Sequence, residues 1–63
     1  MAAQKDTFIE YKLEYIEKGE KKIMEHTQLS KILRFIRREL IRDYSIFGLT
    51  TKNEWKLIMK IGK

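Results

Sequence analysis

At 63 residues, the chain is long enough for one small domain but too short to bury a large core, so its stability is expected to be marginal. It contains no cysteine and a single histidine, which excludes a disulfide framework, a thiolate metal site and a thiol nucleophile. The net charge is +5 and the pI is about 9.6, which indicates an anionic partner.

The first six residues lack the long apolar region of a signal peptide, and no apolar run approaches the roughly 20 residues of a membrane span. Together with the absence of cysteine, this favours a cytoplasmic protein. We expect a single domain over residues 1–63, with residues 1–6 as a disordered leader. Because chains this short usually need additional support, we also expect a homo-oligomer or a bound partner.

The first predicted element is a β-strand. Over residues 9–15, apolar and charged side chains alternate strictly, which is the period-2 pattern of a half-buried strand. Gly19 then suits the third position of a three-residue hairpin loop, a register that pairs Leu13 with Ile23. Residues 21–26 form the second predicted strand, with a weaker pattern.

Residues 27–44 carry a clear helical period. Thr27 is a suitable N-cap, and at about 100° per residue the stretch has two distinct faces. The apolar face consists of Leu29, Ile32, Leu33, Ile36, Leu40 and Tyr44. The opposite face is a cationic stripe formed by Lys31, Arg34, Arg38 and Arg42, with Arg37 at its border. All four arginines of the chain therefore lie on this one predicted element.

The chain after this helix has two interpretations. Residues 45–49 form a predicted break, with Gly48 near the C-terminal cap of the helix. Residues 55–61 alternate largely as a strand does, but residues 51–54 also fit a capping box that would begin a helix. A similar box near the N-terminus leaves residues 8–26 open to a helical interpretation.

We predict an α+β fold with a β-hairpin, one long amphipathic helix and a C-terminal strand that joins the hairpin's sheet (ββαβ). The alternative is an all-α helical miniprotein. The scarcity of alanine favours the first, because helical miniproteins rely on alanine and leucine. In the predicted core, one helix face packs on the strands. The helical members are Leu29, Leu33, Ile36 and Leu40, and the strand members are Ile9, Leu13, Ile23, Trp55 and Leu57.

The cationic stripe is the strongest functional signal in the sequence. Arginine forms paired hydrogen bonds to phosphate oxygens, which lysine does not. We therefore predict a non-enzymatic, nucleic-acid-binding regulator. Its predicted binding residues are Lys31, Arg34, Arg37, Arg38 and Arg42. The alternative is an adaptor or inhibitor that docks the same face on an acidic partner protein, and a solvated face without a partner is a third interpretation.

Other side chains carry weaker signals. Tyr11, Tyr15 and Trp55 could stack on nucleic-acid bases, although core positions are favoured for them. Phe35 either contacts a partner or packs beneath the loop predicted after the helix. His26 is interpreted as a surface residue at a strand end. No catalytic or cofactor motif is present in the sequence, so we expect neither an enzyme nor a cofactor.

Overall fold

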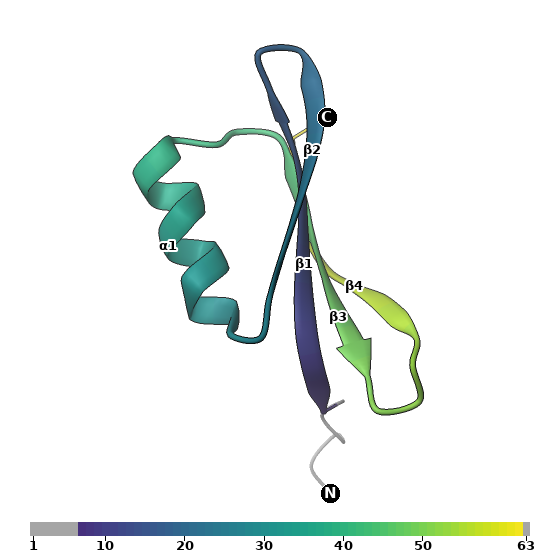
Figure 1. The fold of residues 1–63 in the computed structure, drawn as a ribbon. Coiled ribbons are helices and arrows are strands. Elements are labelled where there is room, and N and C mark those ends of the chain that lie inside the picture. Colours follow the sequence, from purple (N-terminus) through teal and green to yellow (C-terminus); the bar gives the residue numbers. More distant parts are fainter. Residues whose placement is uncertain (1–6, 63) are drawn as a thin grey trace, which may run out of the picture.

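The computed structural model describes residues 7–62 and contains a four-stranded antiparallel sheet with one helix on a single face (Figure 1). In chain order the elements are β1 (Phe8–Glu17), β2 (Glu20–His26), α1 (Leu29–Glu39), β3 (Tyr44–Thr50) and β4 (Trp55–Ile61). The strand order is β2-β1-β3-β4, so α1 carries the chain from one sheet edge across β1 to β3. The α+β prediction is confirmed with one additional strand, and the all-α alternative is wrong. The predicted leader, residues 1–6, lies outside the described residues.

The hairpin of β1 and β2 has a loop one residue shorter than predicted. Lys18 and Gly19 have positive φ values of 52° and 80°, the combination that a two-residue type I′ turn requires. The register pairs Leu13 with Met24 and not with Ile23. Because neighbouring residues of a strand point to opposite faces, this one-residue shift turns Ile23 away from the helix and brings Met24 towards it.

The helix α1 is shorter than predicted at both ends. It begins after Gln28, which makes no side-chain capping hydrogen bond, and not at Thr27. It ends before Leu40, which adopts a left-handed conformation with φ 56° and ψ 45°. The backbone N–H of Ile41 then donates to the carbonyl oxygen of Ile36 at 3.0 Å, which closes the end of the helix.

The predicted break after the helix is instead the inner strand β3. Its register with β1 places Ile46 beside Leu13, and Gly48 on the same face of the sheet. A Cβ at Gly48 would lie 2.5 Å from Cδ1 of Phe8, so this position needs glycine for close packing under an aromatic ring. Gly48 therefore serves the packing of β1 on β3 and does not cap a helix.

The capping-box pattern at residues 51–54 marks a tight loop between β3 and β4. The Thr50 hydroxyl accepts hydrogen bonds from the backbone N–H groups of Lys52 and Glu54, both at 3.2 Å. The N–H of Asn53 donates to the Thr50 carbonyl oxygen at 2.9 Å. A threonine hydroxyl that accepts backbone N–H groups commonly caps a helix, but here it closes a hairpin loop. The strand interpretation of residues 55–61 is confirmed.

The core lies between α1 and the sheet. Its buried hydrophobic side chains are Leu13, Tyr15, Ile32, Ile36 and Ile46. The predicted core is correct for Leu13 and Ile36, and Leu29 packs at the edge of the cluster. Six predicted core members are instead exposed: Ile9, Ile23, Leu33, Leu40, Trp55 and Leu57. The physical reasons are register and helix length, because the strand pairing turns Ile23, Trp55 and Leu57 to the face opposite α1, and the helix ends before Leu40.

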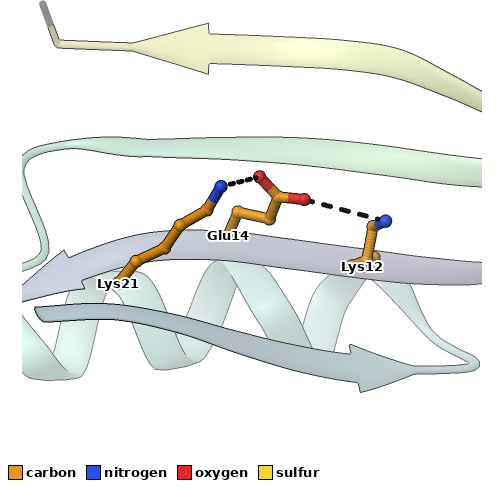
Figure 2. A network of polar contacts seen from close by, with 3 residues as sticks. All are labelled: Lys12, Glu14 and Lys21. Carbon is orange, nitrogen blue, oxygen red and sulfur yellow. Dashed lines mark ion pairs between the residues drawn. The ribbon is translucent and has the colours of Figure 1, made fainter.

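The face of the sheet opposite α1, which we call the open face, carries charged and apolar side chains side by side. Nζ of Lys12 and Nζ of Lys21 lie 3.7 and 3.3 Å from the carboxylate oxygens of Glu14. Figure 2 shows these two ion pairs. The strand registers place six apolar side chains on this same face: Ile16, Ile23, Phe47, Leu49, Trp55 and Leu57. No element within residues 7–62 covers them.

Candidate functional site

Three cations of α1 lie in one row beside β2. Lys31, Arg34 and Arg38 are separated by three and four residues, so they project from the same side of the helix. They line a hollow of about 420 Å³ between the helix and the strand. We call this hollow the cationic groove, and its lining residues are Met24, His26, Lys31, Arg34, Phe35 and Arg38.

The floor of the cationic groove is apolar and belongs to the core. Phe35 packs edge-on against Tyr15 of β1, with the ring centroids 5.5 Å apart. Met24 is half-buried against the same cluster. Cζ of Arg38 lies 5.7 Å from the Phe35 ring centroid, which is a cation–π contact that holds the guanidinium over the floor. Phe35 therefore packs on β1 and not beneath residues 45–49.

The rim of the groove is positive. No Asp or Glu occurs among the described residues that line it. Beyond the lining, Oε2 of Glu39 accepts a hydrogen bond from Nε of Arg38 at 3.2 Å. Both side chains are exposed, so this pair is screened by water and contributes little. The two remaining guanidinium nitrogens of Arg38 have no hydrogen bond in the described part of the chain, and they can donate to an anion.

His26 is a groove residue that the sequence prediction missed. It is the last residue of β2, so its predicted place at a strand end is confirmed. It pairs with Tyr11 on the helix side of the sheet. Strand alternation puts His26 on the same face as Met24, but the predicted register, which paired Leu13 with Ile23, turned that face away from the helix. The helix begins three residues later at Leu29, so the imidazole lies close to Lys31, the first cation of the row.

The other two predicted binding residues lie elsewhere. Arg37 lines a separate hollow of about 220 Å³ together with Ser30, Leu33 and Arg34. Arg42 is exposed in the connection between α1 and β3, because the helix ends before it. The prediction of one continuous stripe is therefore wrong. Three of its members share the cationic groove, and Arg34 stands on the ridge between the two hollows.

The predicted aromatic residues divide between the two faces of the sheet. Tyr15 is buried in the core and Tyr11 packs against it, as favoured from the sequence. Trp55 is not a core residue. It lies on the open face, where Nζ of Lys12 is 4.6 Å from its ring centroid and 5.2 Å from that of Phe47.

No set of three or more His, Cys, Asp or Glu side chains within residues 7–62 is arranged to hold a metal ion. No helix in the described part of the chain is long and apolar enough to cross a membrane. Comparison of the chain with protein-family models, curated proteins and solved structures found no match. The geometry and charge of the cationic groove are therefore the features of the molecule that indicate a function.

Proposed function

We propose that the chain is a non-enzymatic nucleic-acid-binding module that holds backbone phosphates in the cationic groove. The observation that supports this best is the row of Lys31, Arg34 and Arg38 above an apolar floor, with no carboxylate among the described lining residues. Two members of the row are arginines, whose guanidinium groups bind phosphate oxygens in pairs. The Nε2 or Nδ1 hydrogen of His26 adds a further donor at the end of the row.

The length of the row sets the number of phosphates within reach. Seven residues separate Lys31 from Arg38, and at 1.5 Å per residue α1 rises by about 10 Å between them. Successive phosphates of one duplex strand are about 3.4 Å apart along the axis, so the row spans about three such steps. All three cations can therefore contact phosphates of the same strand. Contacts to the nucleic-acid backbone give affinity without sequence specificity.

Fluorescence anisotropy with labelled duplex and single-stranded DNA and RNA, repeated at several salt concentrations, tests this function. Three phosphate contacts predict a slope of log K against log salt of about −2.7 for a duplex and about −2.1 for a single strand. Arg34→Glu/Arg38→Glu removes two of the three contacts. We expect binding to fall below detection at physiological salt, and any residual duplex slope to be shallower than about −1.

The matched control is Arg37→Glu/Lys52→Glu. It changes the net charge by the same amount, but Arg37 lines the other hollow and Lys52 lies in the β3–β4 loop. If affinity depends only on net charge, the two double variants will weaken binding equally, and the groove is not the site. Absence of nucleic-acid binding by the parent chain at low salt would contradict the function itself.

The rival function is an adaptor or inhibitor that docks the same cations on an acidic protein. It differs in its readout, because a docked protein interface depends less on salt than a chain of phosphate contacts. A salt-insensitive complex with an acidic protein that is lost in Arg34→Glu/Arg38→Glu, in a chain that binds no nucleic acid, favours this rival.

A further inference from the structure

The open face of the sheet carries a contiguous apolar patch. The register of β3 with β4 places Phe47 beside Leu57 and Leu49 beside Trp55, so the four side chains form a two-by-two block. Leu57 is 56% exposed and Trp55 is 37% exposed. We call these four residues the apolar patch. Apolar patches with a polar border commonly mark protein interaction sites.

The charges of the open face balance, whereas those of α1 do not. Within residues 7–62, the strand registers place three lysines and three glutamates on the open face: Lys12, Lys21, Lys60, Glu10, Glu14 and Glu25. The helix α1 carries one lysine and three arginines against Glu39. An anionic partner therefore matches the helix side. The open face instead matches a surface of balanced charge, such as its own copy.

We propose that the open face is the interface of a homodimer, in which two sheets pack face to face through their apolar patches. Sheets packed in this way lie about 10 Å apart, with their inner side chains interdigitated. Trp55 belongs to the apolar patch that this interface buries, and buried tryptophans contribute strongly to binding. The ion pair of Lys21 with Glu14 forms part of its polar rim. Nζ of Lys12, which also pairs with Glu14, lies between this rim and the rings of Phe47 and Trp55.

The available area approaches that of a specific dimer. Four strands about 4.8 Å apart, each of seven or more residues at about 3.3 Å per residue, give a footprint of roughly 440 Å² per copy. Side-chain relief makes the accessible surface larger than this footprint. The two footprints together come to roughly 880 Å², and the side-chain surface adds to this towards the roughly 1,000 Å² that a specific interface needs.

The small core also favours a second copy. Among the described residues, ten large hydrophobic side chains are exposed, whereas five hydrophobic residues are buried. A domain of this length without disulfides or a metal usually needs additional apolar burial, which oligomerisation provides. A dimer through the open face supplies that burial and leaves the cationic groove accessible. This inference does not depend on nucleic-acid binding.

Edge-to-edge pairing of the β4 strands of two copies is a poorer alternative to the face-to-face dimer. The register of β3 with β4 shifts between Ile46–Met59 and Phe47–Leu57, which leaves Ile58 as an extra residue. Such a bulge interrupts the row of backbone groups that a new strand would use. Lysines within an edge strand, which β4 carries at Lys56 and Lys60, also oppose the addition of another strand.

Sedimentation velocity of the full chain, without nucleic acid, tests the dimer. At concentrations on the order of 100 µM we expect a species of twice the 7.7 kDa chain mass. Trp55 is the only tryptophan, so its fluorescence reports on the interface directly. Its emission should shift to the blue, and its quenching by acrylamide should fall, as the chain is concentrated through the dimerisation range.

Two variants place a charge in the apolar patch, Leu57→Glu on the edge strand and Leu49→Lys on the inner strand. Both should sediment as monomers while retaining the parent far-UV circular dichroism spectrum. Leu49→Lys separates face-to-face packing from edge pairing, because β3 is not an edge strand. The matched control is Leu40→Glu, which changes an 80% exposed leucine at the end of α1 and should leave the dimer intact.

Three results would overturn the inference. One is a parent chain that remains monomeric up to concentrations on the order of 1 mM. Another is a patch variant that keeps the parent circular dichroism spectrum and still dimerises. The third requires no variant: a parent dimer in which acrylamide quenches Trp55 as strongly as in the monomer places the interface elsewhere.

Discussion

Replacing Gly48 with alanine should destabilise the protein, because Phe8 lies directly over this position. An added Cβ would be 2.5, 2.6 and 2.8 Å from three ring carbons of Phe8, whereas carbon atoms normally approach to about 3.5–4.0 Å. Relief requires the ring to move by about 1 Å. The ring also contacts Tyr11, with centroids 5.9 Å apart, so its movement disturbs a second contact.

The expected loss can be worked out from two opposing effects. Overpacking of this kind costs about 1–3 kcal/mol. Replacing a glycine inside a strand regains about 0.5–1 kcal/mol, because the unfolded chain loses conformational freedom. The difference between the two ranges is about 0–2.5 kcal/mol. Its midpoint of about 1 kcal/mol corresponds to a fall in Tm of about 4–8 °C for a domain of this size. Thermal unfolding followed by circular dichroism, at one fixed protein concentration, measures this shift.

A double-mutant cycle with Phe8→Ala identifies the cause of the loss. Without the ring, Gly48→Ala should be neutral or slightly stabilising, because only the strand preference remains. An equal penalty in both backgrounds would refute the packing argument. It would indicate that Gly48 needs a positive φ, as its predicted place near a helix cap requires, whereas the structure gives it none.

Three further predictions concern local structure, and urea unfolding measures each. Ile32→Ala should cost about 2–5 kcal/mol because the side chain is fully buried, and Leu33→Ala, at 41% exposure, should cost less than half as much. Lys18→Asn should stabilise the hairpin by a few tenths of a kcal/mol, because asparagine adopts positive φ more readily, and a loss would contradict the type I′ turn. Leu40→Gly should stabilise by about 0.5–1 kcal/mol because glycine takes the left-handed conformation without steric cost, and a loss would place the end of α1 elsewhere.

The strand pattern of the first half could be predicted, whereas its register could not. Alternation over residues 9–15 identifies β1 directly, since one face of the strand packs on the helix and the other does not. The register depends on whether the loop contains two or three residues. The loop has two residues because Lys18 adopts a positive φ. Lysine rarely adopts this conformation, so the residue type does not predict it.

The end of the helix could not be predicted, because the apolar spacing of a helix continues by coincidence beyond it. Leu40 and Tyr44 continue the apolar helical period, yet Leu40 is left-handed and Tyr44 begins β3. The glycine that normally marks a helix end occurs at Gly48, where its cause is a contact with Phe8, 40 residues earlier in the chain. A long-range contact of this kind leaves no local pattern.

The candidate site was predictable as far as it depends on helical spacing. The row of Lys31, Arg34 and Arg38 follows from the period of 3.6 residues alone. Arg42 leaves the row because the helix ends early. His26 joins the groove through the packing of α1 beside β2, which is a property of the topology and not of either segment.

The two proposals together predict how binding depends on the length of the nucleic acid. The open face and α1 lie on opposite sides of the sheet, so a dimer through the open faces directs its two cationic grooves away from each other (Figure 1). A short duplex can reach one groove only. Its salt slope should therefore be the same for the parent dimer and for the Leu57→Glu monomer. On a duplex of several hundred base pairs, the parent should join separate molecules and increase light scattering, whereas Leu57→Glu should bind without joining them. A parent slope twice that of Leu57→Glu on the short duplex would place both grooves on one side and contradict the face-to-face arrangement.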